Sequence, residues 1–144
     1  MPRRSSDVGT LSLVGDYSYL RDELTLRGPA DQAQVARLRE QLGRQVPDDY
    51  LEFLIAHDGA DGAVGVLAPV AEIGRAEDLY PELDHLRGLV VFGSDGGLEA
   101  FGFDPAGTVV VLPWIGGRED AVPQGSFAQF LRRLIEGRLL DRNG

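Results

Sequence analysis

Two segments in the first half of the chain carry hydrophobic residues at helical spacing. In residues 28–43, which open on a Gly-Pro pair, Val35, Leu38 and Leu42 fall at i, i+3 and i+7, on one stripe of a helix. Residues 47–56 open on a proline and two aspartates, which favour a first helical turn, and continue with an apolar stripe. The pattern predicts two helices, each followed by a glycine that can end it in a left-handed conformation: Gly43 and Gly59.

The clearest helix is predicted near the C-terminus, after Ser126. Residues 126–129 match a capping box, in which the serine accepts a hydrogen bond from a backbone amide and the glutamine side chain reaches back. Apolar residues at i, i+3, i+4, i+7 and i+8 give this helix a broad hydrophobic face. These residues are Phe127, Phe130, Leu131, Leu134 and Ile135.

Short apolar runs fill the region between these helices. Runs of this kind, bounded by glycine, proline and aspartate, are typical of strands. Residues 104–107, Asp-Pro-Ala-Gly, fit a type I turn and predict a hairpin, and residues 71–79 predict a short helical turn. The predicted strands are residues 11–14, 24–26, 64–67, 89–92, 98–103 and 108–112.

The order of these elements predicts an α+β fold. The strands follow one another without regular helical crossovers, so the sheet is expected to be largely antiparallel, with the helices packed on one face. The length of the chain fits one domain. We expect a single domain over residues 10–140, preceded by a loose tail over residues 1–9.

Charge is unevenly distributed along the 144 residues, whose formal net charge is −9. Residues 45–125 hold three arginines against fifteen acidic residues, a net charge of −12. An acidic surface formed by this segment is expected to repel nucleic acid and to attract a basic protein. The alternative is that the carboxylates only keep the protein in solution.

The composition also bears on the cellular compartment. Cysteine is absent, which excludes disulfides and thiolate metal sites and fits a reducing compartment. The chain contains no run of about 18 apolar residues that could span a membrane. The basic N-terminus is not followed by an apolar stretch, so we expect no secretory signal and a cytoplasmic location.

The sequence offers little support for catalysis. His57 and His85 lack metal-binding spacing, and Ser94 does not stand in a Gly-x-Ser-x-Gly elbow. The glycines of residues 93–97 precede a strand and not a helix N-terminus, which disfavours phosphate binding. The acidic residues lack the order of an EF-hand loop. We expect no catalytic residue, no metal site and no cofactor.

Residues 114–120 are the strongest candidate for contact with a protein partner. A single tryptophan follows a predicted strand and precedes a glycine-rich charged loop, and tryptophan and arginine are enriched in interface hot spots. The alternative is that Trp114 packs at the edge of the core. Two carboxylates in or next to the glycine-rich residues 93–97, those of Asp95 and Glu99, are further candidates. The candidate partner-binding residues are Asp95, Glu99, Trp114, Arg118, Glu119 and Asp120.

Three segments, in order along residues 29–136, resemble the SUKH superfamily, which includes the Smi–Knr family of cell-wall regulators. Residues 46–59 (VPDDYLEFLIAHDG) resemble its second-helix signature. Residues 92–104 (FGSDGGLEAFGFD) resemble its central strand–turn–strand segment, and residues 126–131 (SFAQFL) resemble its closing helix. The resemblance therefore covers nearly the whole predicted domain.

The chain departs from the usual pattern at Asp58, where asparagine is common, and at Leu98, where a third glycine is frequent. The resemblance implies a mixed sheet flanked by helices. It also implies, for many bacterial members, a role as immunity proteins that bind and neutralise toxin domains, often nucleases. We therefore expect a non-enzymatic protein-binding domain whose partner is a basic toxin domain, and neither nucleic acid nor a membrane. The alternatives are an intracellular scaffold without a toxin partner and a metal-dependent hydrolase.

Overall fold

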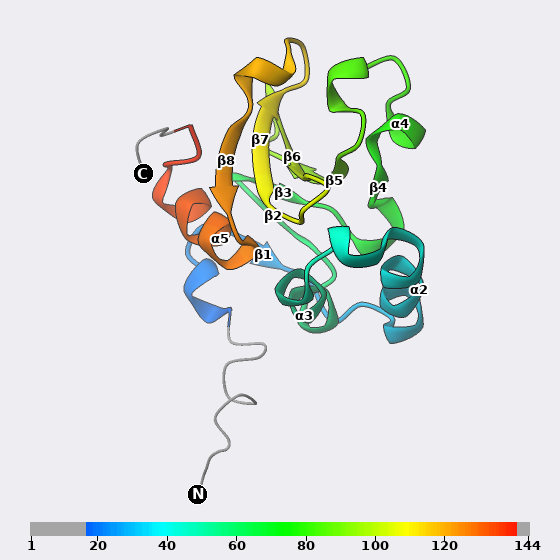
Figure 1. Ribbon diagram of the computed structural model, residues 1–144. Helices are drawn as coiled ribbons and strands as arrows, with labels where there is room; N and C mark the ends of the chain where they lie inside the picture. The colour runs from blue at the N-terminus through cyan, green and yellow to red at the C-terminus, as the bar shows by residue number, and fades with distance from the viewer. Residues whose placement is uncertain (1–16, 141–144) are drawn as a thin grey trace, which may run out of the picture.

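The computed structural model describes residues 17–140. In this part of the chain, one antiparallel sheet is flanked by three longer helices, and a short helix, α4 (Ala76–Leu79), lies beside the strand β4 (Figure 1). The predicted α+β fold with a largely antiparallel sheet is confirmed. The predicted tail over residues 1–9 and the predicted strand over residues 11–14 lie outside the described residues.

The three predicted helices are present as α2 (Gln32–Leu42), α3 (Asp48–Ala56) and α5 (Phe127–Glu136). α2 begins three residues after the proline of the Gly-Pro pair, because Asp31 caps the helix and its side chain accepts a hydrogen bond from the Ala33 amide at 2.9 Å. Gly43 ends α2 with φ 65°, as expected. The capping box is confirmed, since the Gln129 amide donates to the Ser126 hydroxyl at 3.1 Å. Within residues 17–140, no helix combines the length and the apolar character that a membrane crossing requires.

The strands form one sheet in the order β1-β2-β3-β5-β6-β7-β8, and β4 also pairs with β5. β3 pairs with Gly93 and Ser94 at the end of β5, whereas β4 pairs with Val90 and Val91 at its beginning. Every strand pairing within residues 17–140 is antiparallel. The strands are β1 (Thr25–Leu26), β2 (Ala60–Gly62), β3 (Gly65–Leu67), β4 (Gly74–Arg75), β5 (Val90–Ser94), β6 (Glu99–Phe103), β7 (Val109–Pro113) and β8 (Val122–Gly125).

Several elements differ from the prediction. β2 and β8 lie in stretches for which no strand is predicted, because Ala-Asp-Gly and Val-Pro-Gln-Gly offer no regular apolar alternation. Residues 71–79 contain the end of a 3-10 turn, β4 and α4 in place of one helical turn. The 3-10 turns are η1 (Ser18–Leu20), η2 (Gly43–Gln45), η3 (Val70–Glu72), η4 (Asp84–Leu86) and η5 (Arg118–Asp120).

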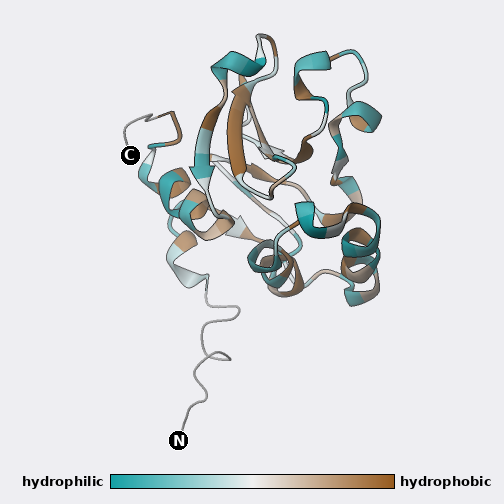
Figure 2. Cartoon of the chain, in the orientation of Figure 1, coloured by the Kyte–Doolittle hydropathy of each residue, from teal (hydrophilic) through white to brown (hydrophobic). Residues whose placement is uncertain are grey.

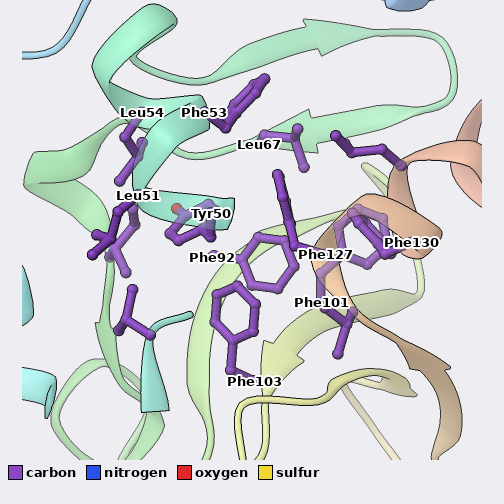
Figure 3. Close-up of a cluster of buried hydrophobic side chains, with 14 of the residues drawn as sticks. Tyr50, Leu51, Phe53, Leu54, Leu67, Phe92, Phe101, Phe103, Phe127 and Phe130 are labelled. Atoms are coloured by element: carbon purple, nitrogen blue, oxygen red, sulfur yellow. The ribbon is translucent and has the colours of Figure 1, made fainter. Parts of the chain in front are cut away.

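Aromatic rings fill the core between the sheet and the longer helices (Figure 3). The ring centroid of Tyr50 in α3 lies 4.9 Å from that of Phe103 in β6 and 4.9 Å from that of Phe127 in α5. Phe92 of β5 stacks on Phe103 with a centroid distance of 4.3 Å. These contacts join two helices to the centre of the sheet.

A second, smaller hydrophobic cluster covers part of the opposite face of the sheet. Val109 and Val111 of β7 face the aromatic core, whereas Val110 and Leu112 face the second cluster. β7 is therefore hydrophobic along nearly its whole length (Figure 2). The longer helices pack on one face as predicted, and the region of α4 and residues 80–89 contributes the cover on the other.

Candidate functional site

All six candidate residues lie at one end of the sheet. The β5–β6 turn (residues 95–98) and the β7–β8 connection (residues 114–121) meet there, because Glu99 pairs with Pro113 and the Trp114 amide donates to the Leu98 carbonyl at 2.9 Å. The β7–β8 connection forms the top of the molecule in Figure 1. We call the group formed by Asp95, Glu99, Glu119 and Asp120 the acidic end of the sheet.

Asp95 shapes the β5–β6 turn. Its Oδ1 atom accepts hydrogen bonds from the backbone amides of Gly97 at 2.8 Å and of Glu99 at 3.1 Å. Gly96 adopts φ 82°, a conformation that glycine tolerates without steric cost. The Ser94 hydroxyl accepts from the Gly96 amide at 3.0 Å, so this serine also belongs to the turn. An asparagine at position 95 would preserve the acceptor atom that the turn requires.

The carboxyl group of Glu99 lies where its ionised form is disfavoured. Its side chain is half-buried, and partial burial, followed by the charges of Asp95 and Asp120, raises the pKa of its carboxyl above the ordinary value. Among residues 17–140, no arginine forms a salt bridge with Asp95 or Glu99. The fold therefore keeps a carboxylate where its ionised form is disfavoured, which is a common feature of functional sites.

Glu119 and Asp120 lie in η5, and both are exposed. Asp120 accepts a hydrogen bond from the Gly117 amide through Oδ2 at 3.2 Å. The Glu119 carboxylate lies over Gly117, in the space that a Cβ atom at that position would occupy. The charge of Asp120 contributes to the raised pKa of Glu99, so η5 lies close enough to the start of β6 for their carboxylates to interact.

Trp114 connects the acidic end to the second hydrophobic cluster. Its ring is half-buried and meets the Tyr80 ring edge-on, with a centroid distance of 5.0 Å. Trp114 therefore packs at the edge of the second hydrophobic cluster and remains partly exposed. The residue also lines a groove of about 500 Å³ and a hollow of about 270 Å³.

Leu98 and Ile115 expose large apolar side chains beside this hollow. Leu98 is 79% exposed and Ile115 is 89% exposed, and both line the hollow together with Glu99 and Trp114. Adjacent exposed apolar residues of this size often mark an interaction site. Neither residue is among the six candidates, although Ile115 lies within the candidate segment 114–120 and Leu98 stands out as an apolar residue in a turn of glycines.

Arg118 holds the β7–β8 connection against residues 84–87. Its Nε atom donates to the His85 carbonyl at 2.8 Å, and one terminal nitrogen donates to the Arg87 carbonyl at 2.5 Å. The His85 ring nitrogen Nε2 lies 2.7 Å from the Pro113 carbonyl oxygen. These contacts fix the loop that carries Glu119 and Asp120.

The fifteen acidic residues of residues 45–125 do not form one surface. Asp104 in the β6–β7 turn lies at the opposite end of β6 from Asp95. Several of these carboxylates have local structural roles, so the whole segment does not form the acidic surface expected from the sequence. Those that accept hydrogen bonds from backbone amides elsewhere in the fold include Asp49, Asp58, Glu77 and Asp104.

His57 makes contacts within the domain. The Nδ1 atom of His57 lies 2.7 Å from the Arg27 carbonyl oxygen, and its ring contacts Tyr17 and Phe53. Within the described part of the chain, no three histidine, cysteine, aspartate or glutamate side chains are grouped so that they could hold a metal ion.

The fold and the site together define a small α+β domain whose distinguishing surface is a group of carboxylates beside exposed apolar side chains. Residues 29–133 match the SMI1/KNR4 family (SUKH-1), and the chain belongs to this family. This match confirms the resemblance that three sequence segments indicate. A comparison with curated proteins gives no match.

Proposed function

We propose that this chain is a non-enzymatic, protein-binding domain of the immunity type, which binds and neutralises a basic toxin domain through the acidic end of its sheet. Membership of the SUKH-1 family supports a role in protein binding. On this proposal, the chain blocks its partner by occupying the partner's surface. The residues in contact are Asp95, Glu99, Glu119 and Asp120, with Trp114 as an apolar anchor.

The observation that carries the proposal is that four carboxylates, Asp95, Glu99, Glu119 and Asp120, lie at one end of the sheet. Partial burial and the charges of Asp95 and Asp120 raise the pKa of Glu99, so its ionised form is disfavoured. A cationic group of the partner would offset the repulsion among these carboxylates. Binding of such a group at the acidic end would therefore be electrostatically favourable. The exposed side chains of Leu98 and Ile115 add apolar surface that a partner can bury.

A nuclease domain matches the acidic end in charge. Proteins that bind nucleic acid carry cationic side chains that contact phosphates, and a negatively charged domain that covers them excludes the substrate. Electrostatic attraction also speeds such an association. Arg118 serves as a positioning residue in this proposal, because its contacts with the His85 and Arg87 carbonyls hold η5 in place.

Neutralising the acidic end tests the proposal. The variant Asp95→Asn/Glu99→Gln/Glu119→Gln/Asp120→Asn keeps side-chain size and keeps an oxygen acceptor for the amides of the two turns. The matched control neutralises four exposed acidic residues far from this end and changes the net charge by the same amount. These control positions are Asp22, Glu23, Glu40 and Glu136.

The three proteins are used to capture partners from the native cells, and each captured protein is identified and its affinity measured. We expect the wild type and the control to retain a basic protein that arrests growth when it is expressed alone and is tolerated when this chain is co-expressed. The acidic-end variant should bind at least about thirtyfold more weakly, since truncating buried charge contacts costs 2 kcal/mol or more. Equal affinity of the acidic-end variant and the wild type would contradict the proposal.

A further inference from the structure

We propose that the hollow at the acidic end receives the side chain of an arginine from the protein partner. This inference rests on the proposed function and specifies what the site binds. The hollow is formed where the β5–β6 turn meets the β7–β8 connection. Its lining residues are Gly97, Leu98, Glu99, Pro113, Trp114 and Ile115.

The size of the hollow fits one side chain. Its volume of about 270 Å³ is below the range of about 300–1,000 Å³ that is typical of sites for whole small molecules. It lies between two exposed apolar side chains, Leu98 and Ile115, which project from separate loops. A long side chain entering between them would cover apolar surface on both.

The lining combines apolar walls with one carboxylate. Leu98, Pro113, Trp114 and Ile115 suit the methylene stem of a long side chain, and only Glu99 among the lining residues is charged. The charges of Asp95 and Asp120 act on the same carboxylate. An apolar occupant would leave this negative charge covered and unpaired, which is costly. A positively charged head group is therefore required.

Arginine satisfies this lining better than lysine. Its planar guanidinium can bind a carboxylate through two hydrogen bonds and can also lie against an aromatic ring, and it loses less hydration than an ammonium group. Glu99 supplies the carboxylate, and the aromatic residue Trp114 also contributes to the lining of the hollow. A carboxylate and an aromatic residue are therefore both available at this place.

Contacts within the domain hold the backbone that forms the lining. The Trp114 amide bonds to the Leu98 carbonyl at 2.9 Å, and the Trp114 ring packs on Tyr80. Arg118 ties the same loop to the His85 and Arg87 carbonyls. A site built in this way loses little conformational entropy on binding.

The single tryptophan provides a direct test, because it gives one indole N–H cross-peak in the spectrum of the ¹⁵N-labelled protein. The probe is the peptide acetyl-Gly-Arg-Gly-amide, and the control peptide carries citrulline, which has nearly the same shape and no charge. Both are titrated at low salt into the wild type, Glu99→Gln, Ile115→Ser and Glu40→Gln. Ile115 is 89% exposed, so its substitution leaves the fold intact.

We expect the arginine peptide to shift the Trp114 indole signal saturably in the wild type and in Glu40→Gln. The citrulline peptide should bind the wild type at least about tenfold more weakly than the arginine peptide does. The arginine peptide should bind the Glu99→Gln variant at least about tenfold more weakly than the wild type, as expected for the loss of a hydrogen-bonded charge. Ile115→Ser should weaken it severalfold. A wild-type indole signal that does not respond to the arginine peptide, or that responds equally to citrulline, would overturn the assignment.

The two proposals can fail separately. If the peptide titration fails while the acidic-end variant still loses the captured partner, the arginine assignment is wrong and the proposed function stands. If the arginine peptide binds as expected but the captured partner binds the acidic-end variant unchanged, the hollow binds arginine and the proposed function is wrong.

Discussion

Two polar side chains, Tyr50 and Glu99, occupy places that lower the stability of the fold. Within residues 17–140, no group forms a hydrogen bond with the buried Tyr50 hydroxyl. Burial, and then the charge of Asp58, raises the pKa of Tyr50 well above its ordinary value. The ring of Tyr50 compensates through its contacts with Phe103 and Phe127. Glu99 makes no salt bridge with the described residues, and burial and neighbouring carboxylates raise the pKa of its side chain.

Replacing Tyr50 with phenylalanine is expected to stabilise the protein. The substitution keeps the aromatic packing and removes a buried hydroxyl whose burial is unpaired, so the free energy of unfolding should rise by about 1 kcal/mol. Urea denaturation measures this change, with Tyr80→Phe, at a half-buried ring, as the control. A Tyr50→Phe protein that is less stable than the wild type would show that the hydroxyl has a stabilising partner.

Replacing Glu99 with glutamine is expected to stabilise the protein at pH 7 and to have less effect in acid. A carboxyl group whose pKa is raised in the folded state binds more protons there than in the unfolded chain, so stability falls as the pH rises through the ordinary value of about 4.3 and up to the raised value. At pH 7 the Glu99→Gln protein should gain roughly 0.3–0.5 kcal/mol, a small amount because solvent screens a half-exposed charge. The gain should shrink as the pH falls towards 4.

Urea denaturation of Glu99→Gln and the wild type at both pH values measures the difference, with Glu40→Gln as the control. A Glu99→Gln protein that is less stable than the wild type at pH 7 would contradict the placement of this charge.

At the scale of elements, local signals account for the helices and for the central strands. The capping box at Ser126 sets the start of α5 through short-range hydrogen bonds, and Gly43 sets the end of α2 through its backbone conformation. Both signals are local, so they can be recognised in the sequence. β2 and β8 form because neighbouring strands offer hydrogen bonds. No residue pattern in Ala60–Gly62 predicts a strand there. The β6–β7 hairpin could be predicted, because Asp104 and Gly107 encode its turn.

The close approach of β3 to β5 is expected to require a glycine at position 93. A Cβ atom there would overlap the Val66 carbonyl oxygen, and backbone atoms cannot move aside without disturbing the pairing. Gly93→Ala should therefore lower the free energy of unfolding by about 2–3 kcal/mol. The control is Gly97→Ala in the same segment, where the nearest atom would lie at 3.7 Å and no such loss is expected. Thermal denaturation of both variants decides the point, and equal stability of the two would contradict it.

At the scale of the whole molecule, the sequence predicts which residues form the acidic end but not the hollow. Asp95 and Glu99 meet residues 114–120 because the β6–β7 hairpin brings its two ends together. The exposure of Leu98 and Ile115, and the contacts of Arg118 with carbonyls some thirty residues away, depend on how loops pack in space. The net charge of −12 over residues 45–125 predicts a larger acidic surface than the fold provides. The surface is smaller because several of these carboxylates accept hydrogen bonds in turns and at helix ends.

The salt dependence of the association rate with the captured partner tests the central claim most directly. Raising the salt concentration from 0.1 M to 1 M shortens the electrostatic screening length from about 10 Å to about 3 Å. We expect the association rate constant of the wild type to fall by at least about tenfold over this range. For the acidic-end variant, the rate constant should start low and change little. Equal rate constants for the wild type at low and high salt would contradict the claim that the acidic end attracts a basic partner.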